Sequence, residues 1–252
     1  MLAHLSRHIE PGARNIAATC SVCPALKLNV CQGMSSCGDV LPGLPNAIPL
    51  ASPVYRCPPR RVICHARDTS EFVPIICSGW AASSVNLSDG RRQIVSFLLS
   101  GDPISIGSLL TPTYGRFVES ITEVTYRKFR RNEFWAVLTQ KPELLESMSR
   151  YWLEERERSD QLAVDLGRRS AEARIARLIL TFVERLKSRG LNQGHNIEFP
   201  LRQKHIADAT GLTAVHVCKV LGEFQRSQLI EITDRWLALV DIDGLRRTAE
   251  WT

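Results

Sequence analysis

The segment 201–240 constrains the fold of this chain more tightly than any other part of the sequence. It contains two short stretches of helical apolar periodicity, LRQKHIADAT and AVHVCKVLGEFQRSQLI, followed by the alternating run EITDRWLALV. Gly211 between the two stretches accepts the positive φ angle of a sharp turn, and Thr213 can cap the second helix. Two short helices, a glycine-containing turn and a β-hairpin describe a winged helix-turn-helix. The alternative is a set of three small helices in an ordinary α-helical domain.

The second of these helices separates apolar from polar residues. The residues expected to face the core are Val217, Val220 and Leu221, with Leu229 and Ile230 beyond the helix. The opposite face carries Ala214, Val215, His216, Cys218, Lys219 and Glu223. Reading a DNA sequence requires side chains that reach base edges, whereas Lys, Arg and Thr nearby hold phosphates. The candidate DNA-binding residues are therefore Thr213, Val215, His216 and Lys219, together with Arg202 and Gln203.

Cys218 has a hypothesis of its own on that polar face. It lies beside Lys219, and a neighbouring cation favours the reactive thiolate form of cysteine. Oxidation of this thiol would place bulk and charge against DNA. Cys218 is therefore a redox candidate, and the alternative is an inert small residue.

A long amphipathic helix is predicted ahead of this domain. The residues at alternating three- and four-residue spacing are Leu145, Met148, Trp152, Glu155, Ser159, Leu162 and Leu166. Such a stripe either packs on its own domain or pairs with the same helix of a second copy, and the charged flank LEERERSDQ favours the second. The candidate dimer contacts are Leu145, Met148, Trp152, Leu162 and Leu166. The pattern breaks at 167–170, where Ser170 is the expected N-cap of a new helix ending at Gly190.

Residues 54–130 show the short apolar runs that are typical of β-strands. The short apolar runs are RVICHA, FVPIICSGWAASSVNL, RRQIVSFLL and FVESITEVTYRKF. Ser88-Asp89-Gly90 lies between two of them and is typical of a hairpin turn. These runs predict a small antiparallel barrel or roll. The preceding residues 1–53 are rich in Gly, Pro, Ser and Ala and predict weakly ordered coil or short helix.

Four stretches of the chain resemble the Crp/Fnr family of bacterial transcription regulators. They are SGWAASSVNLSDGRRQIVSFLLSGD, RRSAEARIARLILTFVERL, IADATGLTAVHVCKVLGEFQRSQLIE and RWLALVDIDGLRRTAE. The resemblance implies an α+β fold with an N-terminal cyclic-nucleotide-binding-type β-roll, a long dimerisation helix and a C-terminal winged helix-turn-helix. It also implies a homodimer that reads palindromic double-stranded DNA, with RNA polymerase as a partner. The expected domains are a Cys-rich segment 1–40, the roll 41–140, the dimerisation helix 141–167 and the DNA-binding domain 168–252.

The DNA-reading helix departs from the pattern of the best-known family members. Those members carry Glu-x-x-Ser-Arg, and Val215, Cys218 and Lys219 stand in these places here. Valine accepts no hydrogen bond from cytosine, and lysine lacks the two-pronged donor of arginine. A different DNA site is therefore expected, in which Val215 can touch a thymine methyl group.

The roll departs from the pattern of relatives that bind cAMP. Those relatives carry a Glu after a Gly, and an Arg-Ser pair for the cyclic phosphate. This chain has Gly107-Ser108-Leu109 at the first place and Arg116 without a following serine at the second. A buried cyclic phosphate needs a cation and hydroxyl or amide donors. We therefore expect no cAMP binding, and the roll is either a structural platform or a receptor for another nucleotide-like effector.

Seven of the eight cysteines lie in the first 77 residues. Cys20 and Cys23 are separated by two residues, a gap that lets two thiolates reach one metal ion, and Cys31 follows. This pattern resembles the N-terminal cysteines of Fnr-like and FixK-like proteins, of which the Fnr-like ones hold an oxygen-labile [4Fe–4S] cluster. The fourth ligand of that cluster comes from the roll, where Tyr126 or a neighbour stands here, so Cys37 is the nearest substitute. Three alternatives stay open for Cys20, Cys23, Cys31 and Cys37: a [4Fe–4S] cluster, zinc, or thiols without metal.

Composition and the remaining motifs limit the other function classes. The formal net charge of +6 is compatible with a nucleic-acid partner. No apolar stretch approaches the ~20 residues of a membrane span, and no apolar signal region precedes Pro11, so we expect a soluble cytoplasmic protein with no membrane partner.

No catalytic spacing is visible, and we expect no enzyme. A thiol oxidoreductase using Cys20 and Cys23 is the remaining enzymatic alternative, although these residues lack the expected strand-then-helix setting. Cys57, Cys64 and Cys77 are expected to be small buried residues of the roll.

Overall fold

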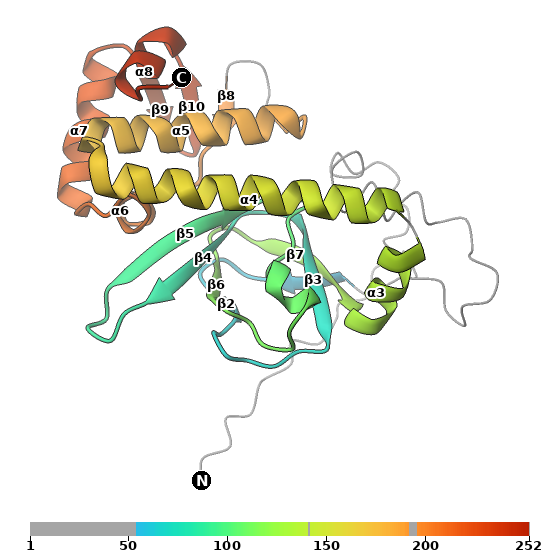
Figure 1. The fold of residues 1–252 in the computed structure, drawn as a ribbon. Coiled ribbons are helices and arrows are strands. Elements are labelled where there is room, and N and C mark those ends of the chain that lie inside the picture. The colour runs from blue at the N-terminus through green and yellow to red at the C-terminus, as the bar shows by residue number, and fades with distance from the viewer. Residues whose placement is uncertain (1–53, 141, 192–195, 252) are drawn as a thin grey trace. The chain divides into compact units, whose positions relative to one another are not determined.

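The structure is a computed structural model and describes residues 54–140, 142–191 and 196–251. The chain forms two compact units, whose elements are labelled in Figure 1. Within the described residues, the first unit comprises 54–81, 98–140 and 142–145. The second unit comprises 82–97, 146–191 and 196–251. The hairpin segment 82–97 therefore packs with the C-terminal part of the chain.

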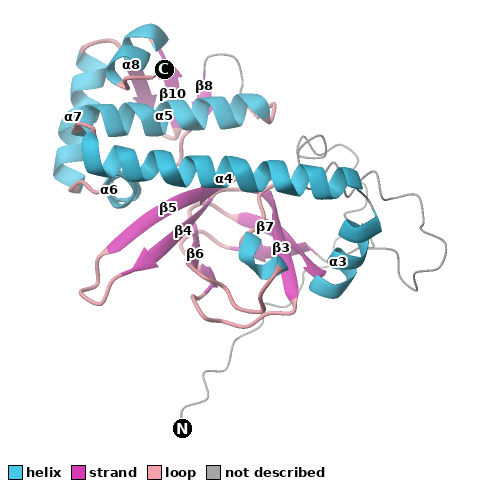
Figure 2. Ribbon diagram, in the orientation of Figure 1, coloured by secondary structure: helices cyan, strands magenta, loops and turns pink. Residues whose placement is uncertain are grey.

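The first unit is built mainly from antiparallel strands (Figure 2). β1 (Val54–Cys57), β7 (Val124–Arg130) and β3 (Phe72–Ser78) form a three-stranded sheet in that order. β2 (Val62–Cys64) pairs with β6 (Phe117–Ser120) in antiparallel register. The short 3-10 helix η2 (Ile106–Leu109) and helix α3 (Arg131–Gln140) also belong to this unit. The antiparallel roll expected from the short apolar runs is confirmed.

Apolar side chains fill the interior of the first unit. The buried members of this cluster are Cys57, Cys64, Ile76, Ala81, Leu98, Ile104, Tyr114, Val118 and Val124. Burial raises the pKa of the Cys64 thiol to about 12, so this thiol stays protonated near neutral pH. Cys57 and Cys64 are buried as predicted, but Cys77 is only half-buried. The pairing register of β3 with β7 shifts between Ile76 and Ser78, so Cys77 lies at an irregular point of the strand where side chains do not follow the regular alternation.

Gly79 divides an apolar run that the sequence suggests as one segment. FVPIICSGWAASSVNL forms two strands, β3 and β4 (Ala81–Asn86), with Gly79 between them. Gly79 has a φ angle of +89°, and a Cβ atom at this position would lie 2.1 Å from the carbonyl oxygen of Glu123. Glycine alone fits such a backbone position. The run FVESITEVTYRKF likewise divides into β6 and β7.

The second unit contains the hairpin, most of the long helix and the C-terminal part of the chain. β4 and β5 (Arg92–Leu98) form the hairpin, and Gly90 with a φ angle of +83° lies in its turn, as the sequence predicts. The helix α4 (Pro142–Arg168) is continuous and is followed by α5 (Ala171–Ser188). The elements that follow are β8 (Asn196–Glu198), α6 (Gln203–Thr210), α7 (Ala214–Arg226), β9 (Ile230–Thr233), β10 (Trp236–Leu239) and α8 (Ile242–Thr248). Strands β8, β10 and β9 form an antiparallel sheet in that order.

The junction between α4 and α5 is a capped helix start. The Ser170 backbone is extended, and its side chain accepts a hydrogen bond from the backbone N–H of Ala173 at 3.1 Å. The predicted N-cap is therefore confirmed. The last residue of α5 is Ser188, and Gly190 follows with a left-handed φ angle of +64°. Ser170 thus fixes the point at which the long helix gives way to the C-terminal domain.

The predicted apolar stripe of α4 is exposed only in part. Met148 is 1% exposed and is therefore packed within the chain, whereas Leu145 is 45% exposed. Three further members are half-buried, namely Trp152, Leu162 and Leu166. Two apolar side chains outside the predicted stripe are exposed as well, Leu153 at 71% and Val164 at 43%. Leu145, Leu153 and Val164 share one side of the helix and are called here the exposed apolar face of α4.

Candidate nucleic-acid interface

A tight turn joins α6 to α7. Gly211 closes α6 with a φ angle of +68°, and its N–H donates to the carbonyl oxygen of Ala207. A Cβ atom at Gly211 would lie 3.1 Å from Cδ2 of Leu166 on α4. The predicted glycine turn is confirmed, and it packs directly against the end of α4.

Gly211→Ala is expected to lower the unfolding free energy by about 1–2 kcal/mol, because alanine is strained at positive φ and crowds Leu166. Gly222→Ala is the matched control. Gly222 lies within α7, and nothing lies within 4 Å of the place a Cβ atom would occupy. Alanine is therefore expected to stabilise that helix by about 0.5–1 kcal/mol. Calorimetry of the full chain should give Tm shifts of opposite sign, and two shifts of the same sign would contradict the assigned turn.

α7 has one buried and one exposed face. The hydroxyl oxygen of Thr213 accepts a hydrogen bond from the backbone N–H of His216 at 3.2 Å, so Thr213 is the N-cap, as expected. The buried residues are Val217, Val220, Leu221 and Phe224. The first three are those that the sequence assigns to the core.

All six predicted DNA-binding residues are exposed. Thr213 is the N-cap of α7, Val215 and His216 lie in its first turn, and Lys219 lies near its middle. Arg202 and Gln203 lie at the start of α6. Cys218 is also exposed, on the same part of α7. The structure therefore brings the four reading-helix candidates together on one accessible surface, which we call the α7 surface.

The α7 surface offers both kinds of contact that DNA recognition needs. The side chain of Val215 is 81% exposed and presents methyl groups, which suit the methyl group of thymine. Lys219 supplies a cation for a phosphate, and the N-terminal end of the helix adds partial positive charge. The surface can therefore combine phosphate binding with apolar base contact.

A carboxylate lies close to this positive end of α7. The pKa of Glu172, in the first turn of α5, is lowered by hydrogen bonds from its own backbone N–H and from Ser170. The charges of His216 and Lys219 lower that pKa further. Glu172 is therefore ionised at neutral pH and attracts the same side chains that would hold phosphate.

The strands beyond α7 form the predicted wing. β9 and β10 pair in register, and the ion pair between Arg235 and Glu198 of β8 spans 2.7 Å. Trp236 is 44% exposed. Arg235 and Trp236 are not among the candidates predicted from the sequence, although an aromatic residue at an outward position of an alternating strand signals an accessible surface. β8 was not predicted because its run of three residues is too short to show a period.

The chain departs from the pattern of cAMP-binding family members at Ser108 and at Arg116, and the structure places these two residues in different surroundings. Ser108 lies in η2, is fully buried, and donates its hydroxyl to the carbonyl oxygen of Ser105 at 2.6 Å. Arg131 at the start of α3 donates its Nε–H to the carbonyl oxygen of Ser108 at 2.6 Å and also bonds Ser70. Arg116 is exposed. These contacts tie η2 to α3 through a guanidinium group.

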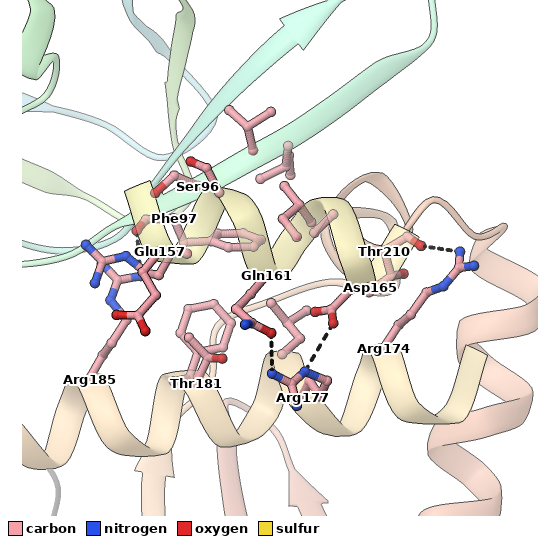
Figure 3. A pocket seen from close by; sticks show the side chains of 18 of the residues that line it. Ser96, Phe97, Glu157, Gln161, Asp165, Arg174, Arg177, Thr181, Arg185 and Thr210 are labelled. Atoms are coloured by element: carbon pink, nitrogen blue, oxygen red, sulfur yellow. Dashed lines mark hydrogen bonds and ion pairs between the residues drawn. The ribbon is translucent and has the colours of Figure 1, made fainter. Parts of the chain in front are cut away.

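A cavity of about 630 Å³ lies in the second unit and is lined by residues of β5, α4 and α5 (Figure 3). Arg177 of α5 crosses it to Asp165 and Gln161 of α4. The Nε–Oδ1 distance to Asp165 is 3.1 Å, with the geometry of an ion pair rather than of an aligned hydrogen bond. Arg177 Nη2 donates to Gln161 at 2.9 Å, and the guanidinium lies 4.8 Å from the ring centroid of Trp251. We call Gln161, Asp165, Arg177 and Trp251 the Arg177 cluster.

The candidate metal ligands Cys20, Cys23, Cys31 and Cys37 lie outside the described residues. Among the residues that are described, no group of three or more His, Cys, Asp and Glu side chains could hold a metal ion. In the same part of the chain, no helix has both the length and the apolar character needed to cross a membrane.

Comparison with known proteins gives the same two modules. Residues 55–141 match the cyclic nucleotide-binding domain, and residues 173–248 match the Crp-like helix-turn-helix domain. The chain is 28% identical over 211 residues to the transcriptional activatory protein AadR of Rhodopseudomonas palustris, covering 83% of this chain and 87% of AadR. It is 30% identical to the nitrogen fixation regulation protein FixK of Rhizobium meliloti, covering 64% of this chain and 70% of FixK.

A solved structure shows the same fold. FixK2 from Bradyrhizobium japonicum superposes with a TM-score of 0.71 at 22% identity, covering 79% of this chain and 98% of FixK2. The predicted α+β architecture of roll, long helix and winged helix-turn-helix is therefore confirmed. The exposed α7 surface, the two matched modules and the identity to FixK lead to one conclusion: the chain belongs to the Crp/Fnr family of DNA-binding transcription regulators.

Proposed function

We propose that this chain binds palindromic DNA as a homodimer, with α7 of each copy in the major groove. The observation that carries the proposal is the α7 surface, on which a capped helix buries Val217 and Val220 and leaves Val215, His216 and Lys219 accessible. A recognition helix needs this combination of a fixed start, a buried face and an accessible face.

The exposed apolar face of α4 supports the homodimer. Leu145, Leu153 and Val164 are all more than two-fifths exposed in the single chain. Full burial of one such side chain contributes about 1.5–3 kcal/mol, so two facing copies of α4 gain stability from covering them. A second copy of α4 is a fitting cover, because the helix is long, continuous and carries charged residues beside this face.

The test is in vitro selection of duplex DNA by the full chain, followed by footprinting and sedimentation. We expect a dimer that protects two symmetry-related half-sites about one helical turn apart. A monomer that protects a single asymmetric site would contradict the proposal.

Cys218 on the α7 surface allows a test of whether oxidation controls DNA binding. Peroxide treatment is expected to weaken operator binding by the wild-type chain about tenfold, because an oxidised sulfur adds bulk and negative charge beside Lys219. The Cys218→Ser chain should keep its affinity. Site-resolved thiol labelling supplies the control, since the buried Cys64 should label only after unfolding. Equal peroxide effects on both chains would remove Cys218 as the sensor.

A [4Fe–4S] cluster on Cys20, Cys23, Cys31 and Cys37 stays a prediction. Anaerobic purification with iron, sulfide and zinc assays tests it. About four iron and four sulfide per subunit, with a visible band bleached by air, would support the cluster. A colourless, metal-free protein that still binds DNA would leave thiol chemistry as the redox input.

Further proposals concern the signal, the partner, the location and the lack of catalysis. A nucleotide-like effector in the roll is the alternative signal, but apolar side chains occupy the roll interior. Membership of a transcription-regulator family supports three further proposals: RNA polymerase as a partner, a cytoplasmic location and the lack of enzymatic activity. Calorimetry against cyclic nucleotides separates the effector alternative from a redox input.

A further inference from the structure

An ion pair joins the β4–β5 hairpin to the helix-turn-helix within the second unit. Arg92 of β5 donates from Nε at 2.9 Å and from Nη2 at 2.7 Å to the same carboxylate oxygen of Asp208 in α6. Next to it, the side-chain amide of Gln93 donates to the carbonyl oxygen of Ala209 at 3.0 Å. Two consecutive residues of one strand therefore hold two consecutive residues of one helix.

This pair differs physically from the ion pair at the hairpin turn. The Arg92 and Asp208 side chains are each only 18% exposed. Arg91 and Asp89 at the hairpin turn are 78% and 49% exposed. Partial burial strengthens charge-assisted hydrogen bonds, and it makes the loss of one partner costly because the other charge stays desolvated. An exposed pair contributes little.

The held residues lie immediately before the DNA-reading helix. Asp208 and Ala209 lead through Gly211 to Thr213, the N-cap of α7. On the other side, Arg174 of α5 donates to the carbonyl oxygen of Thr210 at 3.2 Å. The end of α6 is thus fixed by β5 and by α5 together, and any change of its orientation changes the direction of α7.

Building on the DNA binding by α7 proposed above, we propose that Arg92 is a positioning residue for DNA reading, acting through Asp208. Arg92 lies in the residues that match the cyclic nucleotide-binding domain, and Asp208 lies in those that match the helix-turn-helix. The contact leaves the α7 surface accessible. The pair therefore supports DNA binding by fixing the orientation of α6, and it makes β5 part of the apparatus that reads DNA.

Two single substitutions of opposite charge test the proposal in the full chain. Arg92→Gln removes a cation and Asp208→Asn removes an anion, so simple attraction to DNA predicts weaker binding for the first and tighter binding for the second. Loss of a positioning contact predicts weaker binding for both. Fluorescence anisotropy with a duplex selected by the wild-type chain is expected to show about a tenfold loss for each variant. Binding to a scrambled duplex of equal length measures how each variant changes the sequence-independent electrostatic attraction to DNA.

Three further variants separate positioning from charge and from misfolding. Arg91→Gln removes the same charge one residue away and should bind the selected duplex within about twofold of wild type. The double variant R92D/D208R should recover most of the affinity. Arg92→Lys keeps the charge without the two-pronged geometry and should lose an intermediate amount. The proposal fails if Asp208→Asn binds the selected duplex as tightly as the wild-type chain or more tightly. It also fails if Arg91→Gln loses as much affinity as Arg92→Gln, or if the double variant binds no more tightly than the single variants.

Discussion

Lys219→Glu is expected to bind the selected operator at least about 100-fold more weakly than the wild-type chain at roughly physiological salt. The substitution replaces the cation that we propose binds a phosphate by an anion, in α7 of each copy. It also places a second carboxylate near Glu172, whose pKa the Lys219 charge helps to lower. Anisotropy titrations at several salt concentrations should show a shallower salt dependence, because fewer counterions are released.

Arg226→Glu is the matched control for this charge reversal. Arg226 is the last residue of α7, is exposed, and pairs only loosely with Glu223 at 3.9 Å. The same change of charge at the far end of the helix is expected to weaken binding less than about tenfold. If both variants lost affinity equally, general attraction would explain the binding and the α7 surface would lose its assigned role.

Arg177→Met is expected to lower the unfolding free energy by about 3 kcal/mol. Arg177 is only 11% exposed, and Asp165 is 17% exposed. The substitution removes the ion pair to Asp165, the hydrogen bond to Gln161 and the stacking of the guanidinium on Trp251. Methionine keeps the apolar stem, so the loss measures the contacts that the guanidinium makes with α4 and with the C-terminal residues of the chain. The urea dependence of unfolding of the full chain gives the value.

Arg156→Met gives the comparison for an exposed pair. Arg156 lies on α4 and pairs with Asp160 four residues on, at 3.0 Å, with side-chain exposures of 77% and 63%. Its loss is expected to cost about 0.5 kcal/mol or less. A similar cost for Arg156→Met and Arg177→Met would show that burial adds nothing to the Arg177 cluster.

Local stereochemistry made the DNA-binding domain predictable from the sequence. Gly211 at positive φ, Thr213 as a cap and Ser170 as a second cap each act within a few residues, so their signals are present in short windows. The hairpin turn at Gly90 is of the same kind. The resemblance to a known family then gave the order of the modules.

Contacts between distant residues were not predictable in this way. Arg92 and Asp208 are 116 positions apart, and nothing near either residue marks the other as its partner. The carbonyl oxygen of Glu123, which also lies far along the chain, leaves no room for a Cβ atom at Gly79, the residue between β3 and β4. On α4, the helical period selects a stripe, but neighbouring elements decide that Met148 is covered and Leu153 is not. The residues that couple one module to another can therefore be identified only in the folded chain.

The carboxylate of Glu172 bears on how this regulator finds its sites. A genome offers roughly 10⁶–10⁹ competing positions, all with the same phosphates. The Glu172 carboxylate interacts electrostatically with His216 and Lys219, so it opposes every charged phosphate alike and opposes contacts with the uncharged base edges less. Dwell times on unrelated DNA are therefore expected to shorten more than dwell times on the operator. By weakening the attraction to phosphates that all DNA sequences share, Glu172 would let the protein leave wrong sites sooner and reach its promoters faster.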